Sequence, residues 1–207
     1  MAKAKRRAQK TRKGKRADAT ARLRAEIRRL KAELAAARKR IAGLKAREDI
    51  DPLLGILNRR GFARVLARAI AYIKRYGTGA ALIYIDLDGF KAVNDRHGHA
   101  AGDALLKAAA TALTRHVRAS DVVARLGGDE FAVLLWNVSA PHAEAKARNL
   151  EIIVAQASVA RGKARLSVGA SAGCAPLQPD GSTATMIAAA DKAMYARKKE
   201  RRLSPSS

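Results

Sequence analysis

The chain has 207 residues, of which 48% are hydrophobic, and its 42 Lys and Arg against 18 Asp and Glu give a formal net charge of +24. This hydrophobic content excludes a disordered polymer as a description of the whole chain, and the length suits one folded domain plus an extension. Cys174 is the only cysteine, which excludes an intrachain disulfide and fits a reducing, cytoplasmic setting. No apolar run reaches the roughly 18 residues of a membrane span, so we expect neither a transmembrane segment nor a signal peptide.

Residues 1–18 are predicted to be a basic disordered tail, because they are rich in Lys, Arg and Ala and show no hydrophobic period. Residues 1–50 hold 19 Lys and Arg against 5 Asp and Glu, so they carry +14 of the net charge. Such a segment attracts phosphates on nucleic acid, anionic lipid or nucleotide, and a solvated tail is the alternative. Since no aromatic residue lies among these cations to stack on bases, we expect at most a weak contact with nucleic acid or an anionic membrane.

Residues 19–49 are predicted to form a coiled-coil helix that makes a homodimer. Apolar residues recur there in alternating steps of four and three, which is the a/d pattern of a coiled-coil seam. A single amphipathic helix packed on its own domain is the alternative, and the like charges on the flanks count against the dimer seam. The stripe consists of Leu23, Ile27, Leu30, Leu34, Ala37, Ile41 and Leu44.

From Asp51 the pattern becomes that of a folded domain in which strands alternate with helices. Helices are expected from Asn58 to Tyr76, Gly102 to Arg118, Pro141 to about Ala157, and Thr183 to Glu200. Strands are expected over Ala80–Asp88, Val122–Leu126, Phe131–Trp136 and Ala164–Cys174. Gly127–Glu130 between the two middle strands predicts a hairpin. This mixture predicts an α+β domain with a mixed sheet.

Two carboxylates are placed at the ends of apolar strands. Asp86 lies at the end of the first long strand, and Asp129 follows Gly127 and Gly128 in the hairpin turn. If the two strands are neighbours in one sheet, both carboxylates converge on a divalent cation, since Mg²⁺ binds one or two carboxylates together with substrate phosphates. The alternatives are a strand-end cap for Asp86 and an ordinary turn residue for Asp129.

The segment between Asp88 and Asp103 is too polar for a core and joins a strand to a helix. Asn94 offers an amide donor and acceptor, Asp103 can accept from the N–H groups of a guanine, and His99 is a third polar candidate. Backbone N–H groups near residues 89 and 90 can cradle a phosphate. An Asn-, Gly- and His-rich loop with a helix cap at Asp103 is the equally weighted alternative.

Several spaced motifs resemble those of the GGDEF-domain family, in the same order. Residues 51–60 resemble its opening D-x-L-T-G-L-x-N-R-R, and residues 86–103 resemble its block D-I-D-x-F-K-x-x-N-D-x-x-G-H-x-x-G-D. Residues 125–131 read R-L-G-G-D-E-F, while residues 171–173 and 190–195 resemble the S-I-G strand and the A-D-x-A-L-Y start of the last helix. The motifs span nearly all of the globular part, and several in register are far more specific than any one.

The resemblance implies an α+β fold over residues 50–207, with a mostly antiparallel central sheet flanked by helices as in adenylate cyclases and polymerase palm domains. It implies a diguanylate cyclase, a nucleotidyltransferase of bacterial signalling that joins two GTP molecules into cyclic di-GMP. The 3′-hydroxyl of one GTP attacks the α-phosphate of the other, and pyrophosphate leaves. Each subunit binds one GTP, so the active form is a dimer. A non-catalytic module that binds GTP or cyclic di-GMP as a signalling effector is the alternative.

The family roles carry over to matching positions. The metal ligands for Mg²⁺ or Mn²⁺, two ions per site, are Asp86, the Leu87 backbone carbonyl, Asp129 and the neighbouring Glu130. Asp129 also matches the proton acceptor, with Glu130 as its helper. The substrate contacts that the resemblance implies are Asn94, His99, Asp103, Lys198 and Arg202; Asn94 and Asp103 read guanine, whereas Lys198 and Arg202 bind phosphate. The backbone N–H groups of Gly89 and Phe90 are added as phosphate contacts, and Lys91 is a further phosphate candidate for which a solvated lysine is the equal alternative. Nucleotidyl transfer needs this charge neutralisation at the α-phosphate and the leaving pyrophosphate.

Arg118 and Asp121 resemble the family's inhibitory R-x-x-D motif, which binds cyclic di-GMP as feedback inhibitor, whereas a surface salt bridge is the chance alternative. The chain departs from the family pattern in two places. Leu54 replaces the usual Thr of the opening motif, which affects packing more than chemistry. Near the C-terminus, Arg201 stands where the family has Gly and Leu203 where it has Asn, so the family's short final strand is expected to be shortened or missing.

Overall fold

The computed structural model describes residues 26, 29–31, 33–34, 48–162 and 164–203, with the backbone alone for residues 164, 202 and 203. Residues 1–47 and 48–207 form separate units, which are treated one by one. The described residues of the first unit are helical, and Leu30 and Leu34 each leave about half of their surface exposed. The basic tail and the rest of the heptad stripe lie outside the described residues. The coiled coil, the tail and the domain bounds therefore stay predictions.

The second unit is built on a five-stranded sheet with the strand order β1-β3-β4-β2-β7. Its strands are β1 (Leu57–Asn58), β2 (Ala80–Asp88), β3 (Val122–Gly127), β4 (Glu130–Trp136) and β7 (Gly169–Pro176). The β1–β3 pair is parallel, and the other pairs are antiparallel. The prediction of an α+β fold with a mostly antiparallel central sheet is thereby confirmed.

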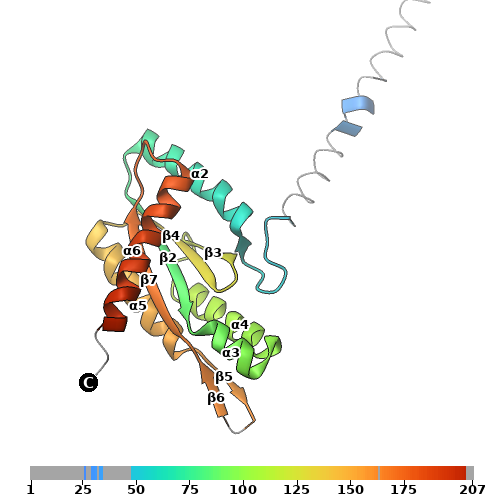
Figure 1. Ribbon diagram of the computed structural model, residues 1–207. Helices are drawn as coiled ribbons and strands as arrows, with labels where there is room; N and C mark the ends of the chain where they lie inside the picture. The colour runs from blue at the N-terminus through green and yellow to red at the C-terminus, as the bar shows by residue number, and fades with distance from the viewer. Residues whose placement is uncertain (1–25, 27–28, 32, 35–47, 163, 204–207) are drawn as a thin grey trace, which may run out of the picture. The chain divides into compact units, whose positions relative to one another are not determined.

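Helices cover both faces of this sheet (Figure 1). One face packs against α2 (Arg59–Tyr76) and α6 (Thr183–Leu203), and the other packs against α4 (His99–Arg115) and α5 (Ala140–Gln156). The central strand β2 alternates between the two cores: Leu82 and Tyr84 face α2 and α6, whereas Ile83 and Ile85 face α4 and α5. Burial on both faces explains why β2 reads as a continuous apolar run.

Local signals set the ends of α2. The Asn58 side chain accepts a hydrogen bond from the Gly61 backbone N–H at 3.0 Å, which caps the first turn. Gly77 ends the helix in the left-handed conformation, with φ of 67°, and its N–H bonds to the Ile73 carbonyl. Within the described part of the chain, no helix is both long and apolar enough to cross a membrane.

The structure differs from the sequence expectations in three places. The polar segment after β2 forms a short helix, α3 (Phe90–His97), and α4 begins at His99 after an N-cap at Gly98, so Asp103 is not a helix cap. The predicted strand from Ala164 divides into β6 (Ala164–Ser167) and β7, and β6 pairs with an unpredicted strand, β5 (Ser158–Arg161). Strands of four residues carry too little hydrophobic alternation to be recognised from sequence. Finally, α6 continues to Leu203, where the family pattern has a loop and a strand.

Candidate active site

The carboxylates of the first motif lie where β2 ends between its two neighbours. Asp86 lies directly opposite Glu130 of β4 and Ser171 of β7 in the antiparallel register. Asp88, two residues on, points to the same face and accepts hydrogen bonds from the Ser171 hydroxyl at 2.9 and 3.1 Å. The predicted adjacency of the Asp86 strand and the hairpin is confirmed, and it places several carboxylates at one edge of the α2/α6 face.

Asp129 lies in the turn between β3 and β4, beside the end of β2. Its backbone carbonyl accepts a hydrogen bond from the Leu87 N–H at 3.2 Å, so the turn is tied to the strand that carries Asp86. Burial raises the pKa of the Asp129 carboxyl; its own backbone amide opposes this, and the negative charge of Asp86 adds to it. The carboxylates of Asp86 and Asp129 therefore repel each other across a partly dehydrated gap, which is an environment that attracts a cation.

Two cations of α6 already lie against these acids. The Lys198 ammonium pairs with Asp86 and lies 3.2 Å from an Asp88 oxygen. Arg201 lies 3.6 Å from the other Asp88 oxygen and donates to the backbone carbonyl of Ala170. Burial lowers the pKa of Lys198, but the hydrogen bonds that its ammonium donates to Asp86 and Asp88 outweigh this effect, so that the pKa is raised overall. The structure thus brings the predicted Lys198 to the acids. It adds Arg201, which stands where the family pattern has Gly and was not predicted to contact them.

Glu130 has a different set of neighbours from Asp129. Its carboxylate lies 3.3 Å from the Arg59 guanidinium at the start of α2. Burial raises the pKa of the Tyr84 phenol, and the neighbouring Glu130 carboxylate raises it further. Glu130 is therefore held on the α2 side of the hairpin, whereas Asp129 lies on the side of Asp86 and Lys198.

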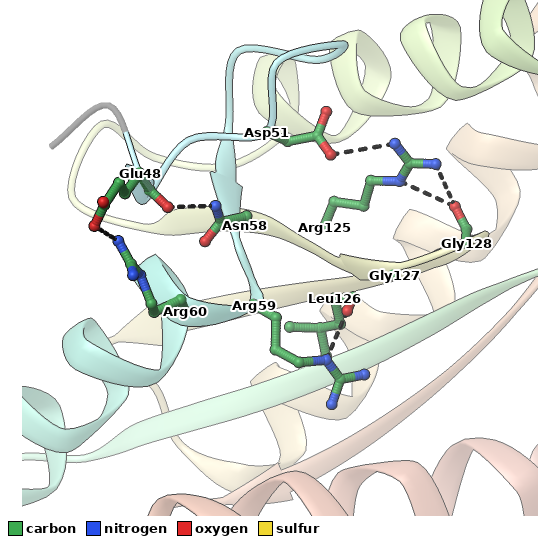
Figure 2. Close-up of a pocket in the computed structure, with 9 residues that line it drawn as sticks. All are labelled: Glu48, Asp51, Asn58, Arg59, Arg60, Arg125, Leu126, Gly127 and Gly128. Carbon is green, nitrogen blue, oxygen red and sulfur yellow. Dashed lines mark hydrogen bonds and ion pairs between the residues drawn. The ribbon is translucent and has the colours of Figure 1, made fainter. Parts of the chain in front are cut away.

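The hairpin is held by a side chain from its own first strand (Figure 2). Arg125 donates to the Gly128 carbonyl at 2.7 and 3.0 Å and pairs with Asp51 at 3.2 Å. The other Asp51 oxygen accepts from the backbone N–H groups of Leu53 and Leu54, so one carboxylate joins the opening turn of the domain to the hairpin. These contacts line an open pocket of about 750 Å³ that also includes Asn58, Arg59 and Arg60. Asp51 and Arg125 belong to the quoted motifs, but no sequence signal predicted their pairing.

Asn94 and the residues around α3 form the next part of the site. The Asn94 side-chain oxygen is buried without a hydrogen-bond partner. It lies over Gly102, where a Cβ atom would come within 1.9 Å of it, so only glycine leaves room for the amide. Lys91, His99 and Asp103 are exposed, whereas the Phe90 ring is buried in the core, which leaves only its backbone for a ligand. A buried carboxamide oxygen without a partner indicates a missing donor.

Arg118 and Asp121 line a separate pocket of about 190 Å³ with Trp136, His142 and Lys146. The two Asp121 oxygens accept from the backbone N–H groups of Arg118 and Trp136, at 3.0 and 3.2 Å. Arg118 is exposed, and among the ion pairs of the described residues it has none with Asp121. The chance alternative of a surface salt bridge is therefore not what the structure contains. The Arg118 side chain is left available to a ligand in this pocket.

Asp86 and Asp129 provide part of a ligand set for the predicted divalent ion. In the described part of the chain, no three His, Cys, Asp or Glu side chains form a complete metal cluster. Mg²⁺ commonly uses only one or two protein carboxylates and takes its other ligands from water and substrate phosphates. Asp86 already pairs with a cation, the Lys198 ammonium. The negative charge of Asp86 also acts on the Asp129 carboxyl and raises its pKa, so the two carboxylates repel each other. The donor set fits a hard divalent ion that shares its ligands with a phosphate.

Comparison with known proteins identifies the family. The family model described as "Diguanylate cyclase, GGDEF domain" matches residues 48–204. The chain belongs to the GGDEF family. Among curated proteins, it is 42% identical over 156 residues to an uncharacterized signaling protein of Caulobacter vibrioides, covering 73% of this chain and 19% of that protein. It is 38% identical over 163 residues to the probable diguanylate cyclase DgcE of Escherichia coli, covering 78% of this chain and 15% of that protein.

Solved GGDEF structures share the fold. A sensory box/GGDEF family protein from Caulobacter crescentus superposes with a TM-score of 0.68 at 40% identity, covering 73% of this chain and 99% of that chain. The coiled coil and GGDEF domain of DgcB from the same organism, in complex with c-di-GMP, gives a TM-score of 0.72 at 27% identity, covering 86% and 95%. The chain spans less than a fifth of the length of the two curated relatives above.

Proposed function

We propose that this GGDEF chain is a diguanylate cyclase that condenses two GTP molecules into cyclic di-GMP. The observation that carries the proposal is the cluster of Asp86, Asp88 and Asp129 at the end of β2, with Lys198 against it and the start of α3 directly behind Asp88. In each half-reaction the 3′-oxygen of one GTP bonds to the α-phosphorus of the other, and the bond from that phosphorus to pyrophosphate breaks. Two such steps release two pyrophosphates and close the ring.

The acids divide the chemical work in this proposal. Asp86, the Leu87 carbonyl and Asp129 hold Mg²⁺ or Mn²⁺, two ions per site. A metal ion held there would supply charge neutralisation at the α-phosphate and at the attacking hydroxyl. Asp129 accepts the hydroxyl proton, and its raised pKa supports this role because a general base works best when its pKa lies near the working pH. Glu130, clamped by Arg59, keeps the turn that carries Asp129 in place and contributes negative charge to the metal side.

The guanine and phosphate ends of GTP have separate binding groups. Asn94 supplies the buried, unpartnered carboxamide oxygen, which can accept from a guanine N–H, and Asp103 of α4 can accept from another. The backbone N–H groups at residues 89 and 90 begin α3, and a helix N-terminus favours phosphate. Lys198 supplies positive charge for the leaving pyrophosphate. His99 and Arg202 are retained as further substrate contacts on the resemblance, and Lys91 is retained as a phosphate contact on its charge. The Arg202 side chain lies outside the described residues.

The reaction requires two subunits that face each other, because each site holds one GTP and the ring contains two. We propose that residues 19–49 form the coiled coil that brings the two domains together. The DgcB structure, whose description names a coiled coil and a GGDEF domain, supports this arrangement by analogy.

Purified protein incubated with GTP and Mg²⁺ tests the activity. Chromatography should detect cyclic di-GMP and pyrophosphate in a ratio of one to two, and Asp129→Ala should remove both. Asp180→Ala is the matched control, since Asp180 is an exposed acid that pairs with Lys74 away from the cluster. A folded, dimeric protein that binds GTP without forming product would refute the cyclase and leave the non-catalytic binding module.

We further propose that cyclic di-GMP inhibits the enzyme at the pocket of Arg118 and Asp121. The exposed Arg118 guanidinium can bind a phosphate or a guanine edge in two hydrogen bonds, beside the indole of Trp136. Arg118→Ala should leave the initial rate unchanged and abolish the slowing of the reaction as product accumulates. Arg115→Ala, an exposed arginine at the end of α4, is the control. Equal product inhibition in both variants would contradict the proposal.

A further inference from the structure

Lys198 pairs with Asp86, one of the carboxylates proposed above to hold the metal ion. Its ammonium pairs with Asp86 and lies 3.2 Å from Asp88, and its side chain is only 20% exposed. Two carboxylates around one partly buried cation resemble the way a protein holds a divalent ion, with the ammonium as a singly charged substitute. A free metal ion and Lys198 would therefore compete for the Asp86 carboxylate.

The two aspartates depend on Lys198 to different degrees. Asp88 also accepts a hydrogen bond from the Ser171 hydroxyl, which is shared between its two oxygens, and lies 3.6 Å from Arg201, so it keeps partners if Lys198 leaves. For Asp86, Lys198 is the only ion-pair partner among the described residues. Departure of Lys198 would expose one bare carboxylate, Asp86, and leave the other in place.

The movement can be confined to the Lys198 side chain. The α6 backbone is fixed on β7, because a Cβ atom at Gly173 would lie 1.9 Å from the Met194 backbone nitrogen. Arg197, the preceding residue, lies 3.7 Å from the buried Glu151, whose carboxylate also accepts from the Ala172 N–H at 2.8 Å. The helix backbone is therefore closely packed here, whereas lysine carries a point charge on a flexible four-carbon stem. Arg201, by contrast, is anchored by its hydrogen bond to the Ala170 carbonyl.

We propose that Lys198 is the resident cation of the acidic site formed by Asp86 and Asp88, and that it excludes free divalent metal until a nucleoside triphosphate draws the ammonium from Asp86 to its phosphates. This rests on the proposed function in one respect, that the site receives a metal–nucleotide complex. Because the phosphates approach the start of α3 directly after Asp88, they offer Lys198 a new partner as the metal takes the old one. Metal and nucleotide then bind with positive coupling, and neither needs a movement of the helix.

Titration of the full chain with Mn²⁺ alone, followed by electron paramagnetic resonance of the free ion, tests the proposal without turnover. Lys198→Met should bind Mn²⁺ about 5- to 150-fold more tightly than the wild type, which is the usual range of coupling between sites. Lys199→Met, the exposed neighbour on α6, should match the wild type. Adding Asp86→Asn to Lys198→Met should abolish the gain. An unchanged or weaker Mn²⁺ affinity in Lys198→Met would overturn the proposal.

A second measurement uses the unmutated contact, in case Lys198→Met alters the fold. The lysines are ¹³C-methylated, and the Lys198 resonance is assigned with Lys198→Arg. It should stay unshifted with Mg²⁺ at millimolar concentration and shift when 3′-deoxy-GTP, which cannot cyclise, is added with Mg²⁺. A shift with Mg²⁺ alone would contradict the exclusion of free metal. The two proposals can fail separately. If the wild type forms no cyclic di-GMP but Lys198→Met still binds Mn²⁺ more tightly than the wild type, the proposed activity is refuted and the resident cation is supported.

Discussion

The ion pair of Asp51 and Arg125 should be one of the strongest single contacts that hold the hairpin. The two side chains are 13% and 17% exposed, and their closest N–O distance is 3.2 Å. Two unit charges about 4 Å apart attract by about 4 kcal/mol at an effective dielectric of about 20, and desolvation offsets part of this. A net coupling free energy of about 1.5–3 kcal/mol remains, in the range for hydrogen bonds to charged groups.

A double-mutant cycle of Asp51→Asn and Arg125→Gln measures this coupling. Asn at position 51 removes the charge and keeps the oxygen that caps the N–H groups of Leu53 and Leu54. The free energy of unfolding is measured by urea denaturation with circular dichroism for the wild type, both single variants and the double variant. Hydrogen exchange of residues 127–130 should accelerate in Arg125→Gln, since the two hydrogen bonds to the Gly128 carbonyl are lost.

The matched control is the pair of Lys74 and Asp180, which has a shorter N–O distance of 2.8 Å but side chains that are 65% and 87% exposed. Water and salt screen that pair, so its coupling should be much smaller than that of Asp51 and Arg125. A coupling of the Asp51 pair below about 0.5 kcal/mol, the limit within which independent sites add, would refute the reasoning. Equal couplings for the two pairs would show that burial is not what strengthens the first.

Three further predictions concern individual residues. Burial raises the pKa of the Asp129 carboxyl in the folded protein, so the ionised carboxylate destabilises the fold above that pKa. Asp129→Asn should therefore raise the melting temperature at neutral pH, and the gain should vanish as the pH falls below about 4, where the carboxyl becomes protonated in the folded and unfolded states alike. An unchanged melting temperature at neutral pH would contradict this. Gly102→Ala should push the Asn94 amide from its position and raise KM for GTP about three- to tenfold, the value of one hydrogen bond, without an equal loss of kcat. Burial raises the pKa of the Cys174 thiol to about 11, so Ellman's reagent at pH 8 should label the native protein far more slowly than the urea-unfolded protein, and equal rates would show that the thiol is exposed.

Much of the fold follows from local patterns in the sequence. The apolar run of β2, the Gly-Gly turn of the hairpin and the helix that follows Asn58 each depend on residues within a few positions of one another, and all are found where the sequence predicted them. The short helix α3 was missed because its only buried residue is Phe90, so it has no apolar stripe to reveal it. The strand pair β5–β6 was missed for a similar reason, since its four-residue strands lie outside the central sheet.

The acids of the candidate site were predictable, and their partners were not. Asp86 and Asp129 were recognisable because a carboxylate at the end of an apolar strand and a carboxylate in a glycine turn are local anomalies. The Lys198 ammonium reaches Asp86 across 112 positions of sequence, and Arg125 reaches Asp51 across 74. Arg201 differs from the family pattern by its identity, yet only the packing of α6 on Gly173 brings it to Asp88.

The sequence by itself determined the α+β class, the family and the acids, because hydrophobic period, turn chemistry and motif spacing are all properties of neighbouring residues. The tertiary structure decided which cation neutralises which acid: Lys198 for Asp86, Arg59 for Glu130 and Arg125 for Asp51. The chain has 42 Lys and Arg, and which of them pairs with a given acid depends on how the helices and strands pack. Coulomb attraction depends on the distance between charges in space and not on their separation along the chain.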